Sequence, residues 1–303
     1  MTYAFSNSAD EAAVQLASLE QFLDPVTTQR IVSLDLRAGA RCWEIGAGAG
    51  SVAAWLAAHV GPAGLVVATD VNTDRLGYAG ALDNVIVARH DVTTLAPPPL
   101  EEEQPYDLIH ARLVLLHLPE REQVLRALVT HLAPGGWLLL EEFDGTAPLP
   151  VYAARSTVDT ELFRRVTGAI IEILEANGAD MTWANAVHPT MRSAGLVDVQ
   201  TVTYRETWTG GGLGTRLHDA NSRQLAERLH ALGITAAELA RFRTIVADPG
   251  HTSGSYVLVS TRGRRPPVVT PAGGPGHPAT VHAGGSPRLP GPGRPPGPET
   301  RRP

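Results

Sequence analysis

The chain has 303 residues, 43% of them hydrophobic, which suits one large α/β domain with insertions and a tail. Its single cysteine, Cys42, excludes an internal disulfide framework and a cysteine-rich zinc site. The formal net charge of −6 is uneven: residues 262–303 hold seven Arg against one Glu, which leaves −12 on residues 1–261. Because phosphate binding requires a basic surface, this acidic body argues against a nucleic-acid partner.

Targeting and membrane signals are the next features that the sequence bears on. The first 25 residues contain four acidic residues and no Lys or Arg, which does not fit a signal peptide. No stretch approaches the roughly 18 uninterrupted apolar residues of a membrane helix. We therefore expect a cytoplasmic protein without a membrane partner.

The N-terminal segment, residues 1–37, is expected to be helical. Apolar residues recur near helical spacing over residues 8–23, which predicts an amphipathic helix. Asp24-Pro25 is predicted to end it, and a second helix is predicted over 26–36. We interpret residues 1–37 as a helical lid over a cofactor; packing against the sheet is the alternative.

A glycine-rich turn follows the first predicted strand. The buried run Arg41–Ile45 opens into Gly46, Gly48 and Gly50, and Ser51–Val60 then has helical spacing. Alternate glycines permit positive φ and let a ligand lie against bare main chain, while the helix start directs N–H groups into the turn. A dinucleotide site needs its third glycine three positions after the second, where this chain has Ser51. Spacing thus excludes the dinucleotide class; taken alone, the turn could also be structural.

Two further predicted strands end in acidic residues. Leu65–Asp70 ends 20 residues after Gly50, and Asn84–Asp91 is a third strand of the same kind. In a βαβ unit such acids reach the crevice at the carboxyl ends of the strands, where a carboxylate can accept from both hydroxyls of a ribose. The alternatives are helix capping by Asp70, before a helix beginning near Thr73, and a cap or turn role for Asp91.

The remaining elements are predicted from the same kinds of pattern. Tyr106–Ala111 is a fourth strand, a helix runs from Pro119 to about Leu132, and Trp137–Leu140 is a fifth strand after the break at Ala133–Gly136. Downstream we predict helices and strands at 155–178 (helix), 186–195 (helix), 196–208 (long edge strand), 219–231 and 235–247 (helices) and 255–260 (closing strand).

The order of these motifs resembles that of class I S-adenosylmethionine (SAM)-dependent methyltransferases. Glu44-x-Gly46-x-Gly48-x-Gly50 resembles the first family motif, and Tyr106–Ala111 and Ala133–Leu140 resemble the signatures of its fourth and fifth strands. The resemblance covers about residues 40–143. It implies an α/β, Rossmann-like seven-stranded sheet with helices on both faces and helical insertions after strands 5 and 6.

The resemblance also implies a domain organisation. The methyltransferase domain spans 38–261, and its substrate-contacting insertions lie at about 150–185 and 210–250. Residues 262–303 contain 12 prolines, nine glycines and no aromatic residue. Because such a segment buries too little surface to offset its chain entropy, we expect a disordered tail.

The cofactor implied by the resemblance is SAM, with S-adenosylhomocysteine as product and no metal. In the family, the acid after the second strand binds the ribose, the acid after the third accepts from the adenine amine, and the backbone of its neighbour reads the ring. The positions that carry these contacts here are Glu44, Gly46, Ala47, Gly48, Gly50, Asp70, Val71, Asp91, Val92 and Ala111.

Methyl transfer is an in-line displacement, for which an enzyme positions the nucleophile at about 3 Å and, where needed, removes its proton. His117 is the candidate base by resemblance; packing on the core is the alternative. His110 is a candidate for backbone contact with the methionine part of SAM. His218 with Asp219, and His251, lie in an insertion and are alternatives from which a base could reach the substrate.

Arg112 has two possible partners in the sequence. Its guanidinium fits the cofactor carboxylate, and it fits equally a structural pairing with Glu141 or Glu142. The sequence leaves both open.

The expected function is methyl transfer to an O- or N-nucleophile of a small organic molecule, in secondary metabolism. One alternative keeps SAM but performs non-methylating chemistry such as cyclisation. Another modifies a protein or RNA. The acidic body argues against RNA, and His110–Leu113 lacks the Asn/Asp-Pro-Pro-Tyr/Phe signature of amino methyltransferases of nucleic-acid bases and protein glutamines. The oligomeric state does not follow from the sequence.

Overall fold

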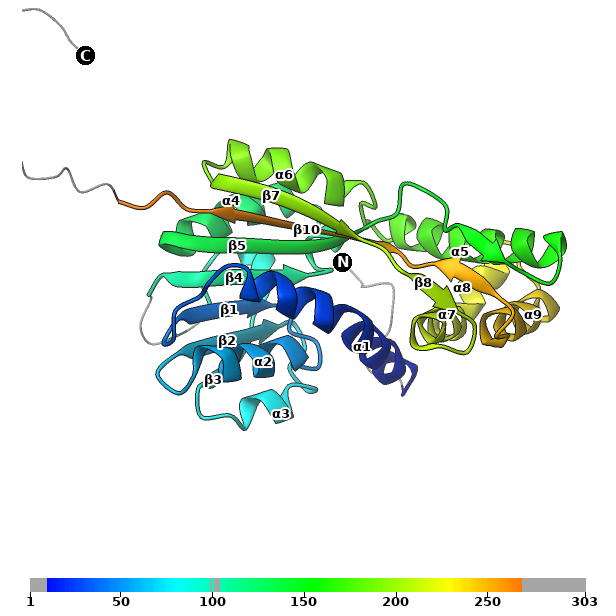
Figure 1. The fold of residues 1–303 in the computed structure, drawn as a ribbon, viewed down its shortest axis with the longest axis horizontal. Coiled ribbons are helices and arrows are strands. Elements are labelled where there is room, and N and C mark those ends of the chain that lie inside the picture. Colours follow the sequence, from blue (N-terminus) through cyan, green and yellow to red (C-terminus); the bar gives the residue numbers. More distant parts are fainter. Residues whose placement is uncertain (1–9, 99, 101–103, 269–303) are drawn as a thin grey trace, which may run out of the picture. The chain divides into compact units, whose positions relative to one another are not determined.

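A seven-stranded sheet forms the centre of the fold, with the strand order β3-β2-β1-β4-β5-β10-β7 (Figure 1). Strands β1 to β5 are parallel, and β10 runs antiparallel to both of its neighbours. This confirms the predicted Rossmann-like sheet. The strand bounds are β1 Arg41–Ile45, β2 Leu65–Asp70, β3 Val85–Arg89, β4 Tyr106–Arg112, β5 Leu132–Asp144, β7 Val197–Tyr204 and β10 Val257–Arg264.

The structure, a computed structural model, describes residues 10–268 except 99 and 101–103. All of these belong to one compact unit. The predicted tail lies almost entirely outside the described residues, but its boundary at 262 is too early: β10 continues to Arg264, where it pairs with Trp137 of β5.

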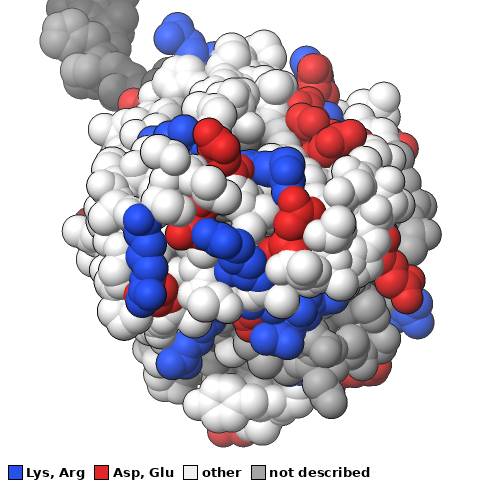
Figure 2. Space-filling view, turned by 90° about the vertical axis from the view of Figure 1, so that its right-hand side faces the viewer, with Lys and Arg blue, Asp and Glu red and all other residues white. Residues whose placement is uncertain are grey.

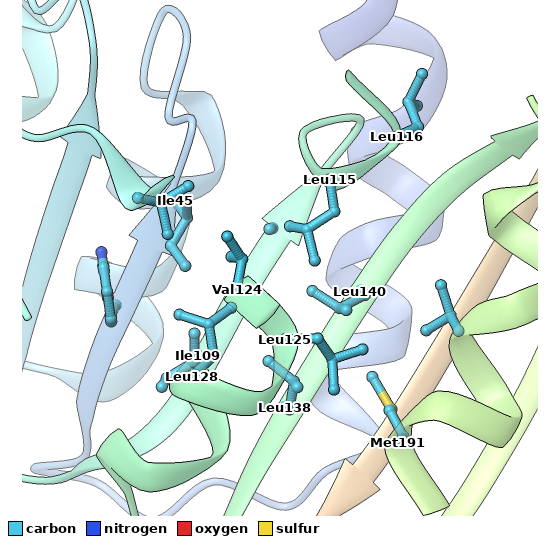
Figure 3. Packing of buried hydrophobic residues seen from close by; sticks show 14 of the residues in the cluster. Ile45, Ile109, Leu115, Leu116, Val124, Leu125, Leu128, Leu138, Leu140 and Met191 are labelled. Atoms are coloured by element: carbon cyan, nitrogen blue, oxygen red, sulfur yellow. The ribbon is translucent and has the colours of Figure 1, made fainter. Parts of the chain in front are cut away.

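Helices cover both faces of the sheet, as predicted. On one face, α1 (Asp10–Val32), α2 (Ser51–Val60) and α3 (Gly77–Gly80) pack over Cys42, Val66 and Leu139. On the other, α4 (Arg121–His131) and α6 (Trp183–Ser193) pack over Ile109, Leu138 and Leu140 (Figure 3). Successive side chains of a strand point to opposite faces, so the apolar run of β5 supplies both layers.

A helical part lies beyond one end of the sheet (Figure 1). It consists of α5 (Thr157–Ala176), α7 (Leu213–Gln224), α8 (Ala226–Ala231) and α9 (Ala236–Ala247), with its own core around Phe163, Trp208 and Phe242. On its outer face, basic and acidic side chains are interspersed and no patch of one sign forms (Figure 2).

A second, three-stranded sheet in this part was not predicted. It joins β6 (Val151–Ala153), β9 (Thr252–Gly254) and β8 (Thr207–Thr209), in that order. Three-residue strands are too short to show a periodic pattern, so only the fold brings them together. The predicted strand over 196–208 is therefore two strands: β7, which is indeed a sheet edge, and β8.

The prediction of two N-terminal helices is wrong. Helix α1 continues through Pro25, although proline removes one hydrogen bond from a helix interior. Burial on both sides of Pro25 explains this: Leu23 and Ile31 are fully buried, and α1 packs along α7 and α2. Tertiary packing thus outweighs the local preference.

Candidate functional site

The glycine turn between β1 and α2 depends on residues without a side chain. Gly46, Gly48 and Gly50 have φ values of 65°, 60° and 92°. A Cβ on Gly46 would lie 2.4 Å from Cγ2 of Val114. Gly50 is the N-cap of α2 and provides no side-chain cap, and Glu20 of α1 accepts hydrogen bonds from Ser51, the first residue of the helix.

A cavity of about 520 Å³ opens over this turn. Its wall includes the carboxyl ends of β1 to β4 and side chains of α1, α5 and α7, which is where open α/β sheets bind ligands. Nine of the predicted site residues line it: Glu44, Gly46, Ala47, Gly48, Asp70, Val71, Asp91, Val92 and His117. Gly50 and Ala111 are not among the lining residues, and their roles as cofactor contacts stay predictions.

Asp70 is tied to the glycine turn. Its Oδ2 accepts a 3.0 Å hydrogen bond from the Gly48 N–H, and its Oδ1 accepts one from the Asn72 N–H. The alternative interpretation, capping of a helix near Thr73, is wrong, because the next helix is the four-residue α3, capped by Leu76. Asp70 therefore joins β2 to the turn across the crevice.

Asp91 does act as a cap. Its side chain accepts from the N–H and the hydroxyl of Thr93, at 3.0 and 2.7 Å, at the start of the short helix η1 (Val92–Thr94). These two hydrogen bonds lower the pKa of Asp91, so it is ionised at neutral pH. Since Asp91 and Val92 also line the cavity, the cap positions an acceptor there.

His110 on β4 lies between two buried carboxylates. Its Nδ1 is 2.6 Å from Oε2 of Glu44, and its Nε2 is 3.5 Å from Oε2 of Glu141. Burial by itself would lower the pKa of His110, but the two carboxylates raise it to about 9, so the imidazolium is stabilised. Burial likewise opposes ionisation of Glu141, yet hydrogen bonding to His110 leaves its pKa lowered.

Arg112 takes a structural position, one of the two alternatives that the sequence left open, but its direct partners were not predicted. It forms an ion pair with Asp24 of α1 at 2.9 Å and donates to the hydroxyl of Thr27 at 3.0 Å. The Thr27 hydroxyl in turn donates to Glu141 at 2.5 Å. Arg112 thus meets Glu141 through Thr27, and it also lines the cavity.

His117 ends a short helix, η2 (Leu115–His117), and faces the cavity. Burial and the charge of Arg121 lower its pKa to about 4, so its imidazole is neutral at physiological pH. Glu142 holds this turn: one carboxylate oxygen accepts from the N–H groups of Leu115 and Leu116, at 2.9 and 3.3 Å. Burial raises the pKa of Glu142 to about 8.

His218 and His251 are not placed at the cavity. Both are buried in the helical part, where their rings pack against Phe163, and His218 also packs against Trp208 and Tyr256. Burial lowers the pKa of His218 to about 3. Both are core histidines, so neither is placed to act as a base in the cavity.

Helix α1 contributes cavity residues that the sequence analysis missed. Gln15, Leu16, Leu19 and Glu20 line the cavity. Glu20 accepts hydrogen bonds from Ser51 at the start of α2, although burial leaves its pKa raised. The helical period of residues 8–23 predicted a helix and left open whether it covers a cofactor or packs against the sheet, but it did not single out these four residues.

Neither a metal-ligand cluster nor a membrane-spanning helix occurs among the described residues. Among them, no group of three or more His, Cys, Asp or Glu side chains is placed to hold a metal ion. Every helix in the described part of the chain is too short or too polar to cross a membrane.

The residues around the turn fit SAM. The main chain at Gly46 and Gly48 has positive φ and carries no side chain, and α2 begins directly after the turn without a side-chain cap from Gly50. Acceptors for a ribose and an exocyclic amine, Asp70 and Asp91, stand on neighbouring strands. Glu44 supplies a carboxylate at the cavity floor. Together these features define a nucleoside-cofactor-binding α/β protein.

Comparison with known proteins names the family. Residues 43–138 match the family model described as "Methyltransferase domain". A crystal structure of a proposed methyltransferase from Bacillus halodurans C-125 shares the fold, with a TM-score of 0.51, 18% identity, and coverage of 79% of this chain and 98% of that one. The family match and the motifs described above support a class I SAM-dependent methyltransferase.

Curated relatives support the same family. Methyltransferase str2 of Strobilurus tenacellus is 30% identical over 166 residues, which cover 54% of this chain and 56% of that protein. Methyltransferase GfsG of Streptomyces halstedii is 33% identical over 122 residues, or 39% of this chain and 42% of that protein. The matched region thus spans about half the length of these relatives.

Proposed function

We propose that this protein transfers a methyl group from SAM to an oxygen or nitrogen atom of a small organic molecule, in secondary metabolism. One observation carries the proposal: the glycine turn and an apolar chamber share a single cavity. A cofactor bound along the turn therefore has its reactive end beside a space in which an acceptor can be enclosed.

The chamber is formed mainly by apolar side chains from α1, α5, α7 and the strand ends. They are Leu16, Leu19, Phe143, Ile170, Ile171, Leu174, Met181, Leu217 and Tyr256. Apolar walls with few polar groups are typical of small-molecule sites. Asn177 and Asn221 are polar exceptions, so the acceptor we expect has an apolar body and a small number of hydrogen-bonding groups.

The chain's own residues have distinct proposed roles. Asp70 binds the ribose hydroxyls, Asp91 and the Val92 backbone bind the adenine, and Glu44 binds the ammonium of the amino-acid end. SAM, when bound, supplies a methyl group already activated by its sulfonium. His117, neutral at physiological pH, accepts the proton of the acceptor, and the chamber excludes water from the reacting atoms.

The first test of this function is cofactor binding. Calorimetry with SAM is expected to show binding by the wild type and at least a tenfold weaker affinity for Asp70→Ala, because a buried ribose would lose a bidentate acceptor. Asp74→Ala, an exposed neighbour outside the cavity wall, is the matched control. No binding by the wild type, or equal binding by the Asp70 variant, would refute the proposal.

The second test is turnover. A panel of phenols, carboxylic acids and amines with apolar bodies is incubated with SAM, and the formation of S-adenosylhomocysteine is measured by mass spectrometry. Methylated O- or N-products support the proposal. Binding of SAM without methylation of any panel member would favour the non-methylating alternative.

A further inference from the structure

A continuous chain of polar contacts runs beneath the cavity from β1 to α1. It begins at Glu44, passes through His110 and Glu141, and reaches the hydroxyl of Thr27, with successive separations of 2.6, 3.5 and 2.5 Å. Arg112 then ties Thr27 to Asp24 on α1. Two strands, β4 and β5, thus connect the floor of the glycine turn to α1, the helix that precedes β1 in the chain.

Burial makes this arrangement costly to disturb. Glu44, His110, Glu141 and Thr27 are each at most 3% exposed. A buried carboxylate requires a charged or hydrogen-bonding partner, and removing that partner leaves an uncompensated charge. His110 supplies this partner to Glu44 and Glu141 at once. The positions of the two carboxylates are therefore linked through one imidazole.

Helix α1 covers the same turn from above. Leu16 approaches Gly48 closely enough that a Cβ there would lie 3.6 Å from its Cδ2, and Glu20 accepts hydrogen bonds from Ser51 at the start of α2. Both Leu16 and Glu20 line the cavity. Further along the same helix, Asp24 and Thr27 flank Pro25 and hold the polar chain. The helix thus contacts the cofactor site at one end and the buried network at the other.

We propose that His110 is a positioning residue for the cofactor: it holds Glu44 at the floor of the turn and, through Glu141 and Thr27, couples that carboxylate to the docking of α1. Cofactor binding and closure of α1 then stabilise each other, because both depend on the same buried contacts. The inference rests on the proposed function, since it takes SAM or S-adenosylhomocysteine as the bound ligand.

The first test separates the two sides of His110. Asn places an amide nitrogen near Nδ1, whereas Gln places one near Nε2, so His110→Asn keeps the donor to Glu44 and His110→Gln keeps the donor to Glu141. By calorimetry with S-adenosylhomocysteine, we expect His110→Gln to bind at least tenfold more weakly than His110→Asn. Equal affinities of the two folded variants would overturn the role of His110.

The second test cuts the network at α1 and leaves His110 in place. Thr27→Val preserves side-chain volume but removes the hydroxyl, and Thr27→Ser restores it, so these variants remain informative if substitutions at His110 prevent folding. We expect S-adenosylhomocysteine to slow amide exchange across residues 15–32 in the wild type and in Thr27→Ser. In Thr27→Val this protection is lost and affinity falls about tenfold.

The outcomes distinguish this inference from the proposed function. Normal ligand binding by the wild type, together with unchanged affinity and unchanged α1 protection in Thr27→Val, would contradict the coupling alone. Absence of ligand binding by the wild type would contradict the proposed function and the coupling with it.

Discussion

At the scale of single residues, this site is organised by buried titratable groups whose partners are other side chains. Two adjacent acids of β5 show how strongly the partners of a buried carboxylate change its pKa. Glu141, which meets His110, has a lowered pKa, whereas Glu142, which accepts only backbone N–H groups, has a pKa raised to about 8. Alternation along the strand sends them to opposite faces, so neighbours in sequence have opposite ionisation states at neutral pH.

The role of His117 as the base gives a residue-scale prediction. Replacing it with Ala removes the proposed proton acceptor, so we expect kcat to fall by about 10²- to 10⁴-fold. In the wild type, kcat/KM is expected to fall as the pH drops through about 4, the pKa of His117. The pH profile of His117→Ala is expected to lack this fall.

A matched control for His117 is available in the same cavity. His90 also lines this cavity, next to Asp91, so His90→Gln is expected to alter the KM for SAM and to keep the fall of kcat/KM at acidic pH. Wild-type turnover by His117→Ala would remove His117 from the mechanism.

At the scale of elements, the glycine turn and α1 form two walls of one space. The side chain of Asp70 accepts a hydrogen bond from the Gly48 N–H, and Leu16 of α1 lies next to Gly48. α1 reaches this position only because it continues through Pro25 and remains one helix. The shape of the cofactor site therefore depends on a helix that local sequence signals divide in two.

Substitution of Gly46 tests the conformational requirement of the turn. Gly46→Ala combines a φ of 65° with a Cβ 2.4 Å from Val114, so we expect SAM affinity to fall at least tenfold. Gly61→Ala is the control: it carries the same kind of backbone strain, with a φ of 72°, but its Cβ would meet nothing within 4 Å. Calorimetry on both folded variants compares them. Equal losses of SAM affinity in the two variants would show that backbone strain alone, and not the shape of the turn, lowers the affinity.

At the scale of the whole molecule, the cavity is a joint product of the sheet and the helical part. The strand ends supply polar groups, and α1, α5 and α7 supply much of the apolar wall. The core of the helical part around Phe163 and Phe242 also includes Phe22 of α1 and Leu258 of β10. Under the proposed function, we expect the sheet to bind the cofactor and the helices to select the acceptor.

Global stability is predicted to decline as the pH rises from about 6.5 to 9, where Glu142 and His110 act in the same direction. Glu142 has a folded pKa of about 8 against an ordinary value of 4.5, so its stabilising contribution is complete below about 4.5 and is lost as the pH rises through 8. His110, raised from 6.5 to about 9, acts in the same direction, and its contribution is lost between those values.

Glu142→Gln isolates the first of these contributions. The amide oxygen still accepts from Leu115 and Leu116, but no buried charge forms at high pH. We expect the variant to match the wild type near pH 5 and to exceed its free energy of unfolding by a few kcal/mol near pH 9. Urea denaturation at both pH values measures this, with the exposed Glu122→Gln as control. A difference that does not change with pH would contradict the assignment.

The sequence by itself determined the parts of this protein that depend on local order. The spacing of Gly46, Gly48 and Gly50, the acid that ends β2 and the acid two residues after β3 predicted the turn, the parallel strands and the edge of the sheet at which a ligand is expected. These features can be predicted from the sequence because each is set by backbone conformation or by the two-residue period of a strand.

Only the tertiary structure decided which distant side chains meet. The chain from Glu44 through His110 and Glu141 to Thr27 joins residues from three strands and a helix, and no local pattern encodes those partners. The continuation of α1 through Pro25 and the burial of His218 have the same origin. In each case the free energy of packing and of pairing buried charges outweighs the local preference, and that energy exists only after the chain has folded.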